Sequence, residues 1–216
     1  MADPTAFPVR LSIDYPDRDL NRLTTFFRGI LIIPAGVILA LVTAPIWTWG
    51  PGADPHQGPQ IWRAFFAMGT FLFVPTLLMI LFRRKYPRWW FDWNVAVTKF
   101  SARVVCYGAL LTDEYPSTER EQAVHIDIPY PDAQADLLPG LPLVKWFLAI
   151  PHWFLLFFLA WAAGFCIFIS WFAILFTGRF PRGLFNFVVG VGRWALRAGA
   201  YAFLLVTDVY PPFSLD

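Results

Sequence analysis

The chain has 216 residues, of which 57% are hydrophobic and 15% charged, with a mean hydropathy of +0.52 and a formal net charge of +2. Soluble domains average about 45–50% apolar and about 25% charged residues. The excess of apolar residues predicts a membrane protein, and the small net charge argues against a nucleic-acid partner. The 11 Trp and 23 Phe residues suit a chain that meets the membrane interface.

The first half contains two apolar segments, at about residues 24–49 and 61–82, each long enough to cross a bilayer. Residues 1–19 precede them without an apolar core, so we expect no signal peptide. The polar loop Pro51–Gly58 joins the two segments, and the cluster Arg83-Arg84-Lys85 ends the second.

The second half contains one apolar run, residues 143–176. A single helix of that length would be about 50 Å long, against a hydrocarbon core of about 30 Å. We therefore predict a tight helical hairpin that turns near Ala162-Ala163-Gly164. The alternative is one long, tilted helix whose first turns, before Pro151, lie in the membrane interface.

Positive charge orients the predicted spans. Arg and Lys are concentrated after residue 82 and after residue 178, whereas the Pro51–Gly58 loop has none. The positive-inside rule then places both termini and the middle of the chain in the cytoplasm. We expect a multi-pass protein of a bacterial inner membrane.

Two stretches of the chain resemble each other in order. Residues 9–17 match 124–132, Arg28 to Pro34 matches Lys145 to Pro151, and residues 112–116 match 207–211. This predicts a mainly α, polytopic membrane protein with two parallel pseudo-repeats, residues 1–118 and 119–216. Each repeat would hold a short β-strand, a transmembrane helical hairpin and an amphipathic interfacial helix, at residues 88–111 and 182–206.

The strands are predicted from alternating apolar and polar residues in Val9–Tyr15 and Val124–Tyr130. An isolated pair of strands is marginally stable in water. We expect these strands to pair with Thr112–Tyr115 and Thr207–Tyr210.

Six cations recur with the same spacing on the two amphipathic segments and form the candidate binding set. They are Arg88, Lys99 and Arg103 in the first half and Arg182, Arg193 and Arg197 in the second. Each trio falls on one helical face, which favours contact with anionic lipid headgroups or with an acidic partner surface. The alternatives are simple headgroup anchoring, and a polar stripe buried in a spanning helix.

The sequence shows no pattern of catalytic residues. It has no phosphate-binding loop, no HExxH or GxSxG motif and no paired catalytic carboxylates. We expect no enzyme activity, no cofactor and no metal site. His152 is a weak candidate for a metal ligand, because it lies in an apolar run, but its matched residue is Ala35. Cys106 and Cys166 are expected to be buried apolar residues, with palmitoylation of Cys106 as the alternative.

Two stretches of the second half carry a family resemblance. They are Leu143-Val144-Lys145-Trp146-Phe147-Leu148-Ala149-Ile150-Pro151-His152 and Trp171 to Phe185, which contains Gly178-Arg179-Phe180-Pro181-Arg182-Gly183-Leu184-Phe185. From Val124 to the C-terminus the chain resembles the bacterial membrane family known as domain of unknown function 4389, and the first half resembles a degenerate copy of it. The resemblance implies a membrane location and a fold, and no activity.

Taken with the absence of catalytic patterns, the Trp- and Phe-rich composition favours a non-enzymatic auxiliary or scaffold subunit of a larger membrane complex. We expect its partners to be membrane lipids, anionic ones above all, and other membrane protein subunits. The alternatives are a lipid-binding membrane protein and a small transporter or channel, since pseudo-symmetric halves are common in transporters.

Overall fold

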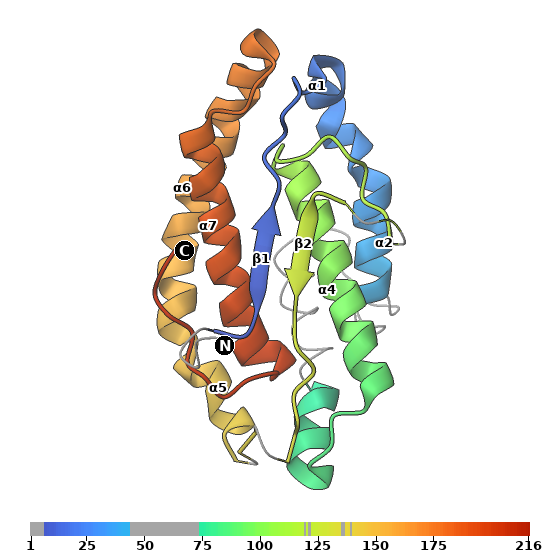
Figure 1. The fold of residues 1–216 in the computed structure, drawn as a ribbon, viewed down its shortest axis with the longest axis vertical. Helices are drawn as coiled ribbons and strands as arrows, with labels where there is room; N and C mark the ends of the chain where they lie inside the picture. Colours follow the sequence, from blue (N-terminus) through green and yellow to red (C-terminus); the bar gives the residue numbers. More distant parts are fainter. Residues whose placement is uncertain (1–6, 44–73, 119, 121, 135–136, 139) are drawn as a thin grey trace, which may run out of the picture.

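The structure is a computed structural model, and it describes residues 7–43, 74–118, 120, 122–134, 137–138 and 140–216. In this part of the chain the fold is mainly helical, with one two-stranded sheet (Figure 1). The elements are β1 (Arg10–Ile13), α1 (Arg22–Leu31), α2 (Ile33–Thr43), α4 (Arg88–Gly108), β2 (Val124–Asp127), α5 (Pro142–Leu148), α6 (Ile150–Thr177) and α7 (Arg182–Gly199), which continues as a short π-helix, η2 (Ala200–Leu204). A further apolar helix covers Val74–Arg83.

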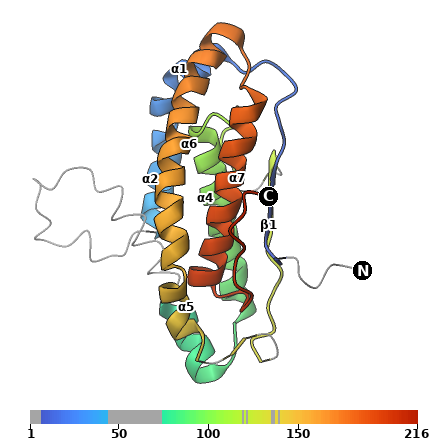
Figure 2. The ribbon, with the colours of Figure 1, turned by 90° about the vertical axis from the view of Figure 1, so that its left-hand side faces the viewer.

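The elements form three layers, seen edge-on in Figure 2. One outer layer contains α1, α2 and α6, the middle layer contains α4 and α7, and the sheet forms the other outer layer. The middle layer supplies a large share of the core, through residues such as Phe185, Val189 and Trp194. From the sheet, Leu11 and Ile126 point into this core.

Both strands are found where the alternating pattern predicts them, but their predicted pairing is wrong. β1 pairs with β2 in antiparallel register, with Leu11 opposite Ile126, and not with Thr112–Tyr115 or Thr207–Tyr210. The apolar residues of both strands then lie on one face, against α4 and α7. Packing of this shared face supports a sheet that would be marginal on its own.

The predicted hairpin within residues 143–176 is also wrong. α5 ends at Leu148, and α6 then continues without a break through Ala162-Ala163-Gly164 to Thr177. Pro151 lies in the first turn of α6. Backbone N–H groups there have no acceptor within the helix, so proline, which has no N–H, is tolerated at this position. A single glycine in an apolar run does not end a helix. The long-helix alternative is therefore correct, with a separate short helix before Pro151.

Equivalent elements of the two halves run in opposite directions along the long axis of the molecule. The prediction of parallel repeats concerns their orientation in a membrane, and it stays a prediction. The strands are antiparallel, and Figure 1 shows α6 running opposite to α1 and α2, and α7 opposite to α4. The physical reason is the connection between α4 and α5, which contains β2 and carries the chain back along the length of the molecule.

The two predicted amphipathic helices are present as α4 and α7, and each begins directly after a proline, Pro87 or Pro181. The first predicted span is present as α1 and α2 up to Thr43. The second is present from Val74 to Arg83. The rest of both spans, the Pro51–Gly58 loop and the proposed outer side of the protein lie outside the described residues.

Large apolar side chains are exposed over much of the α1, α2 and α6 layer. They include Phe26, Ile30, Ile38 and Leu41 on the first two helices and Phe154, Phe158, Phe165 and Phe168 on α6. By length and composition, the helical stretch Arg22–Thr43 and helix α6 are apolar enough to cross a membrane. The coarse expectation of a membrane protein is compatible with this surface.

Candidate functional site

Each half of the chain contacts the other through the tyrosine that follows its strand. The Tyr15 hydroxyl donates a hydrogen bond of 2.5 Å to the Phe180 carbonyl, and the Tyr130 hydroxyl donates one to the Tyr86 carbonyl. Phe180 and Tyr86 both come directly before the proline that precedes a middle-layer helix. The two hydrogen bonds are therefore equivalent, and each ties one half to the other.

Two of the six candidate cations belong to these contacts. The Arg182 guanidinium lies 4.9 Å from the Tyr15 ring centroid, and that of Arg88 lies 5.1 Å from the Tyr130 ring centroid. Exposed cation–π contacts of this kind contribute about 0.5–1 kcal/mol. Both arginines thus contact the strand-end tyrosine of the opposite half, a role that their spacing alone did not indicate.

Two buried ion pairs, which the sequence reasoning missed, hold the other end of each half. Arg28 pairs with Asp113, and Lys145 pairs with Asp208 at 2.6 Å. Arg28 also donates a hydrogen bond of 2.6 Å to the Thr112 carbonyl, and Lys145 donates one of 2.7 Å to the Thr207 carbonyl.

The same carboxylates also accept backbone hydrogen bonds. Asp113 accepts one of 2.7 Å from the Asn21 N–H, and Asp208 accepts one of 2.7 Å from the Leu138 N–H. The sequence contains these residues at positions that match between the halves: a cation six residues before a proline, and a Thr-Asp pair near the end of each half. Only the fold shows that each cation meets its Thr-Asp pair.

A left-handed residue directs each Thr-Asp pair toward its cation. Leu110, after α4, has φ +66°, and Leu205, after η2, has φ +56°. Both leucines are buried, so packing holds a conformation that costs about 1–3 kcal/mol in a non-glycine residue. Burial lowers the pKa of Lys145, and the hydrogen bond and charge of Asp208 oppose that shift. These pairs are structural clamps between the layers.

Arg193 and Arg197 do not extend freely toward headgroups. The Arg193 Nε–H donates a hydrogen bond of 3.0 Å to the Leu11 carbonyl at the outer edge of β1, and Arg197 donates one of 2.8 Å to the Ser214 carbonyl. Arg193 also contacts the Leu215 carbonyl at 3.5 Å. The C-terminal residues 214–216, which we call the tail, thus lie along α7 beside β1.

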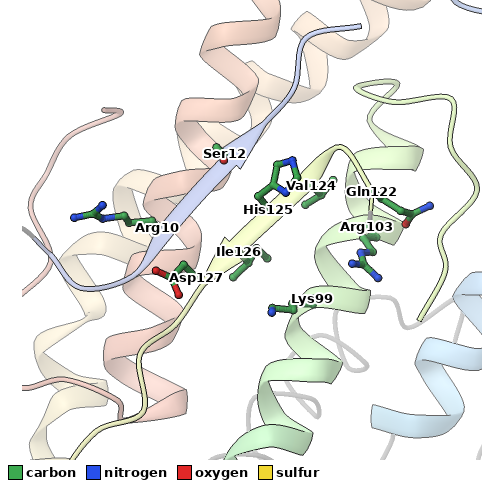
Figure 3. Close-up of a pocket in the computed structure, with 9 residues that line it drawn as sticks. All are labelled: Arg10, Ser12, Lys99, Arg103, Gln122, Val124, His125, Ile126 and Asp127. Carbon is green, nitrogen blue, oxygen red and sulfur yellow. The ribbon is translucent and has the colours of Figure 1, made fainter. Parts of the chain in front are cut away.

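The matched cations of the first half, Lys99 and Arg103, lie beside β2 and line an open groove of about 370 Å³ (Figure 3). Its full lining is Arg10, Ser12, Lys99, Arg103, Gln122, Val124, His125, Ile126 and Asp127. Arg103 donates a hydrogen bond of 2.5 Å to the Ser117 carbonyl. Lys99 has no hydrogen bond or ion pair with any residue that the structure describes.

Lys99 and Arg103 bring two positive charges to the side of β2, against one carboxylate in the lining, which makes the groove positive overall. It opens on the sheet layer, on the side of the molecule opposite the apolar helices. The structure therefore separates the six candidate cations. Two contact tyrosines, two hold the tail and β1, and two line an open, basic groove.

His152 is fully buried and serves as a packing residue. Its Nδ1 accepts a hydrogen bond of 2.9 Å from the Trp194 indole N–H, and its ring stacks on Phe213 with 4.0 Å between centroids. An Nδ1 that accepts from Trp194 leaves the proton on Nε2, so the ring is neutral. Over the described ranges, no three His, Cys, Asp or Glu side chains gather in a way that could hold a metal ion.

The comparisons with known proteins identify part of the chain. Residues 142–214 match the family model described as Domain of unknown function (DUF4389). This confirms the resemblance of the second half, over a shorter stretch than the one beginning at Val124. The degenerate copy in the first half and the bacterial origin stay predictions. The match contains α5, α6, α7 and the Lys145–Asp208 clamp. No curated protein and no solved structure matches the chain.

Proposed function

We propose that this chain is a non-enzymatic scaffold or auxiliary subunit of a membrane protein complex. In this proposal its apolar layer lies in the bilayer and its sheet layer holds a partner protein. The observation that carries the proposal is the order of the layers. Exposed Phe, Leu and Ile residues cover α1, α2 and α6, whereas the opposite face bears a charged groove. Large exposed apolar patches mark contact with lipid or protein.

The sheet layer supports a particular placement in the membrane. The strand segments run parallel to α6 along much of its length, with the middle layer between them (Figures 1 and 2). If the long axis were normal to the bilayer, Arg10 and Asp127 would lie at hydrocarbon depth, where each charge is costly unless a partner covers it. We therefore favour an arrangement in which the apolar layer is immersed and the sheet stays in water or against a partner.

The finer expectations on location belong to this proposal. We place the sheet layer, in which β1 and the C-terminus both lie, in the cytoplasm of a bacterium, on its inner membrane. The multi-pass arrangement and the two-repeat division at residues 1–118 and 119–216 stay predictions. Reporter fusions test them: position 56 is expected to read as periplasmic, and position 120 and the C-terminus as cytoplasmic.

A test of the scaffold role is co-purification from native membranes in mild detergent. We expect a defined set of protein partners that elutes with the chain at constant stoichiometry and remains in the membrane after a carbonate wash. A monomer that elutes alone under the mildest conditions contradicts the scaffold role. Residues of the clamps are poor probes of partner binding, because their loss would alter the fold itself.

One observation favours lipid binding as a second function. An apolar depression of about 400 Å³ lies between α1 and α6, lined by residues that include Phe26, Ile32, Phe168 and Trp171, with Arg28 beside it. Its walls suit an acyl chain. If this is the main role, native lipid should stay bound through purification. Widening the depression with Phe168→Ala should then release that lipid without changing partner recovery.

A further inference from the structure

The tail and the groove occupy matched places in the two halves. Arg193 and Arg197 follow Pro181 by the same spacing as Lys99 and Arg103 follow Pro87. In the second half these cations bind the carbonyls of the tail and of β1. In the first half, Arg103 donates a hydrogen bond to the Ser117 carbonyl, and the chain then turns back and forms β2. No segment among the described residues fills the place beside Lys99 that the tail fills in the other half.

The backbone of β2 adds hydrogen-bonding capacity to the groove. The Asp14 N–H donates to the Ala123 carbonyl, so Asp14 and Ala123 form a hydrogen-bonded antiparallel pair. In such a ladder, hydrogen-bonded and non-hydrogen-bonded pairs alternate. Val124 and Ile126 therefore belong to non-hydrogen-bonded pairs, and their N–H and C=O groups point to the outer edge of β2. This edge faces the groove, as the Leu11 carbonyl faces Arg193 on the other side.

We propose that the groove binds the carboxyl-terminal segment of a partner protein. The segment would lie in extended conformation along the outer edge of β2, with its terminal carboxylate at Lys99. Strand addition to an exposed sheet edge is a common mode of peptide recognition, in which backbone hydrogen bonds give affinity. The chain's own tail shows that the matched cations can hold an extended segment beside the sheet, since Arg193 contacts the Leu215 carbonyl and Arg197 donates to the Ser214 carbonyl.

The charge and position of the groove favour a peptide over a lipid headgroup. Lys99 and Arg103 outweigh Asp127, so the groove attracts a carboxylate; the Arg10 side chain points away from both cations across β1 (Figure 3). A headgroup would reach it only from the side of the sheet, whereas the apolar layer lies on the opposite face. This inference rests on the proposed scaffold role and names the chemistry of the partner.

The probe for this inference is a synthetic peptide with the sequence of Pro211–Asp216 and a free carboxyl terminus, added to the full-length protein in mild detergent. We expect saturable binding that Lys99→Gln weakens by about tenfold, the change expected when one charge-assisted contact of about 1.4 kcal/mol is lost. Lys99→Arg should retain binding, because it keeps the charge. Arg22→Gln, which removes an exposed cation from α1, is the matched control and should change nothing.

A peptide that ends in Asn-amide in place of Asp should bind as weakly to the wild-type protein as the acidic peptide binds to Lys99→Gln. Two outcomes overturn the inference. In one, binding is lost in Arg193→Gln and kept in Lys99→Gln, which means that the peptide only displaces the tail. In the other, Lys99→Gln lowers binding to phosphatidylglycerol vesicles and leaves peptide binding unchanged, which assigns the groove to a headgroup.

The test is independent of the scaffold proposal. Peptide binding that depends on Lys99, in a protein from which no partner co-purifies, supports the groove and contradicts the scaffold. Partners that co-purify equally well with wild type and Lys99→Gln, together with no peptide binding, support the scaffold and overturn the groove.

Discussion

The Tyr15 hydroxyl lies 2.5 Å from the carbonyl oxygen of Phe180, a residue 165 positions further along the chain. The equivalent hydrogen bond joins the Tyr130 hydroxyl to the Tyr86 carbonyl. The strands are exchanged between the halves: β1, from the first half, packs on α7, and β2, from the second half, packs on α4. Neither half buries its own strand on its own middle-layer helix. We infer that the two halves fold as one cooperative unit.

Replacing Tyr15 or Tyr130 with phenylalanine should lower the free energy of unfolding by about 1 kcal/mol each, because each change removes one hydrogen bond and keeps the ring. Denaturant unfolding in detergent measures the effect, and both changes should leave a single transition. Tyr115→Phe is the control, since its hydroxyl makes no hydrogen bond within the described residues. Separate transitions for the two halves would contradict the exchanged packing.

Neutralising a clamp should cost far more than removing a surface pair. Asp208→Asn keeps an acceptor for the Leu138 N–H but leaves the buried Lys145 ammonium without its counter-charge. Breaking one partner of a buried pair costs about 3–5 kcal/mol. We expect a lower melting temperature and poor expression, both partly restored by adding Lys145→Met.

The exposed pair of Asp19 with Arg179 is the comparison for this clamp. Asp19→Asn should leave the melting temperature nearly unchanged, because exposed pairs contribute little. Equal losses at Asp19 and Asp208 would show that Lys145 is hydrated in the folded protein.

Two glycine substitutions test the continuous helix α6 and the seating of the tail. Gly164→Ala should be neutral or should stabilise the protein by up to about 1 kcal/mol, because alanine favours a helix and its Cβ would meet nothing within 4 Å. Gly190→Ala should displace the tail, since its Cβ would lie 2.8 Å from the Leu215 carbonyl oxygen. Thermal unfolding and proteolysis of the C-terminus report the two effects. A destabilising Gly164→Ala would instead indicate a turn at that position.

The thiol of Cys106 should resist modification in the folded protein. Its side chain is buried, and burial raises the pKa of Cys106 to about 12. Thiolate is the reactive form, and at pH 8 almost none is present at such a site. Maleimide labelling followed by mass spectrometry should modify Cys106 only after unfolding. Palmitate or rapid labelling at Cys106 in the native protein would contradict its burial.

The sequence predicted the local structure better than the arrangement in space. Alternation at Val9–Tyr15 and Val124–Tyr130 located both strands, because one face of each is buried. The pairing of those strands is set by α4 and α7, which no local pattern records. The hairpin at Ala162–Gly164 was wrong because the length argument assumed a helix that crosses the bilayer, and it did not consider a long helix packed along the layer below.

The candidate site was only partly predictable for a similar reason. Lys99 and Arg193 are indistinguishable by spacing, and only the path of the tail shows that Arg193 is covered and Lys99 is open. The clamp residues Arg28 and Asp113 were visible as separate matched positions. The ion pair between them depends on the left-handed conformation of Leu110, which no sequence pattern predicts.

The most direct test of the central claim is a map of lipid contact along the chain in native membranes. Phospholipids that carry a photoactivatable carbene precursor in the acyl chain would be irradiated with the wild-type protein, and the labelled peptides identified by mass spectrometry. A two-faced membrane scaffold predicts label on the exposed residues of α6, such as Phe158 and Phe165, and none on β1 or β2. Label on both strands together with an unlabelled α6 would contradict it.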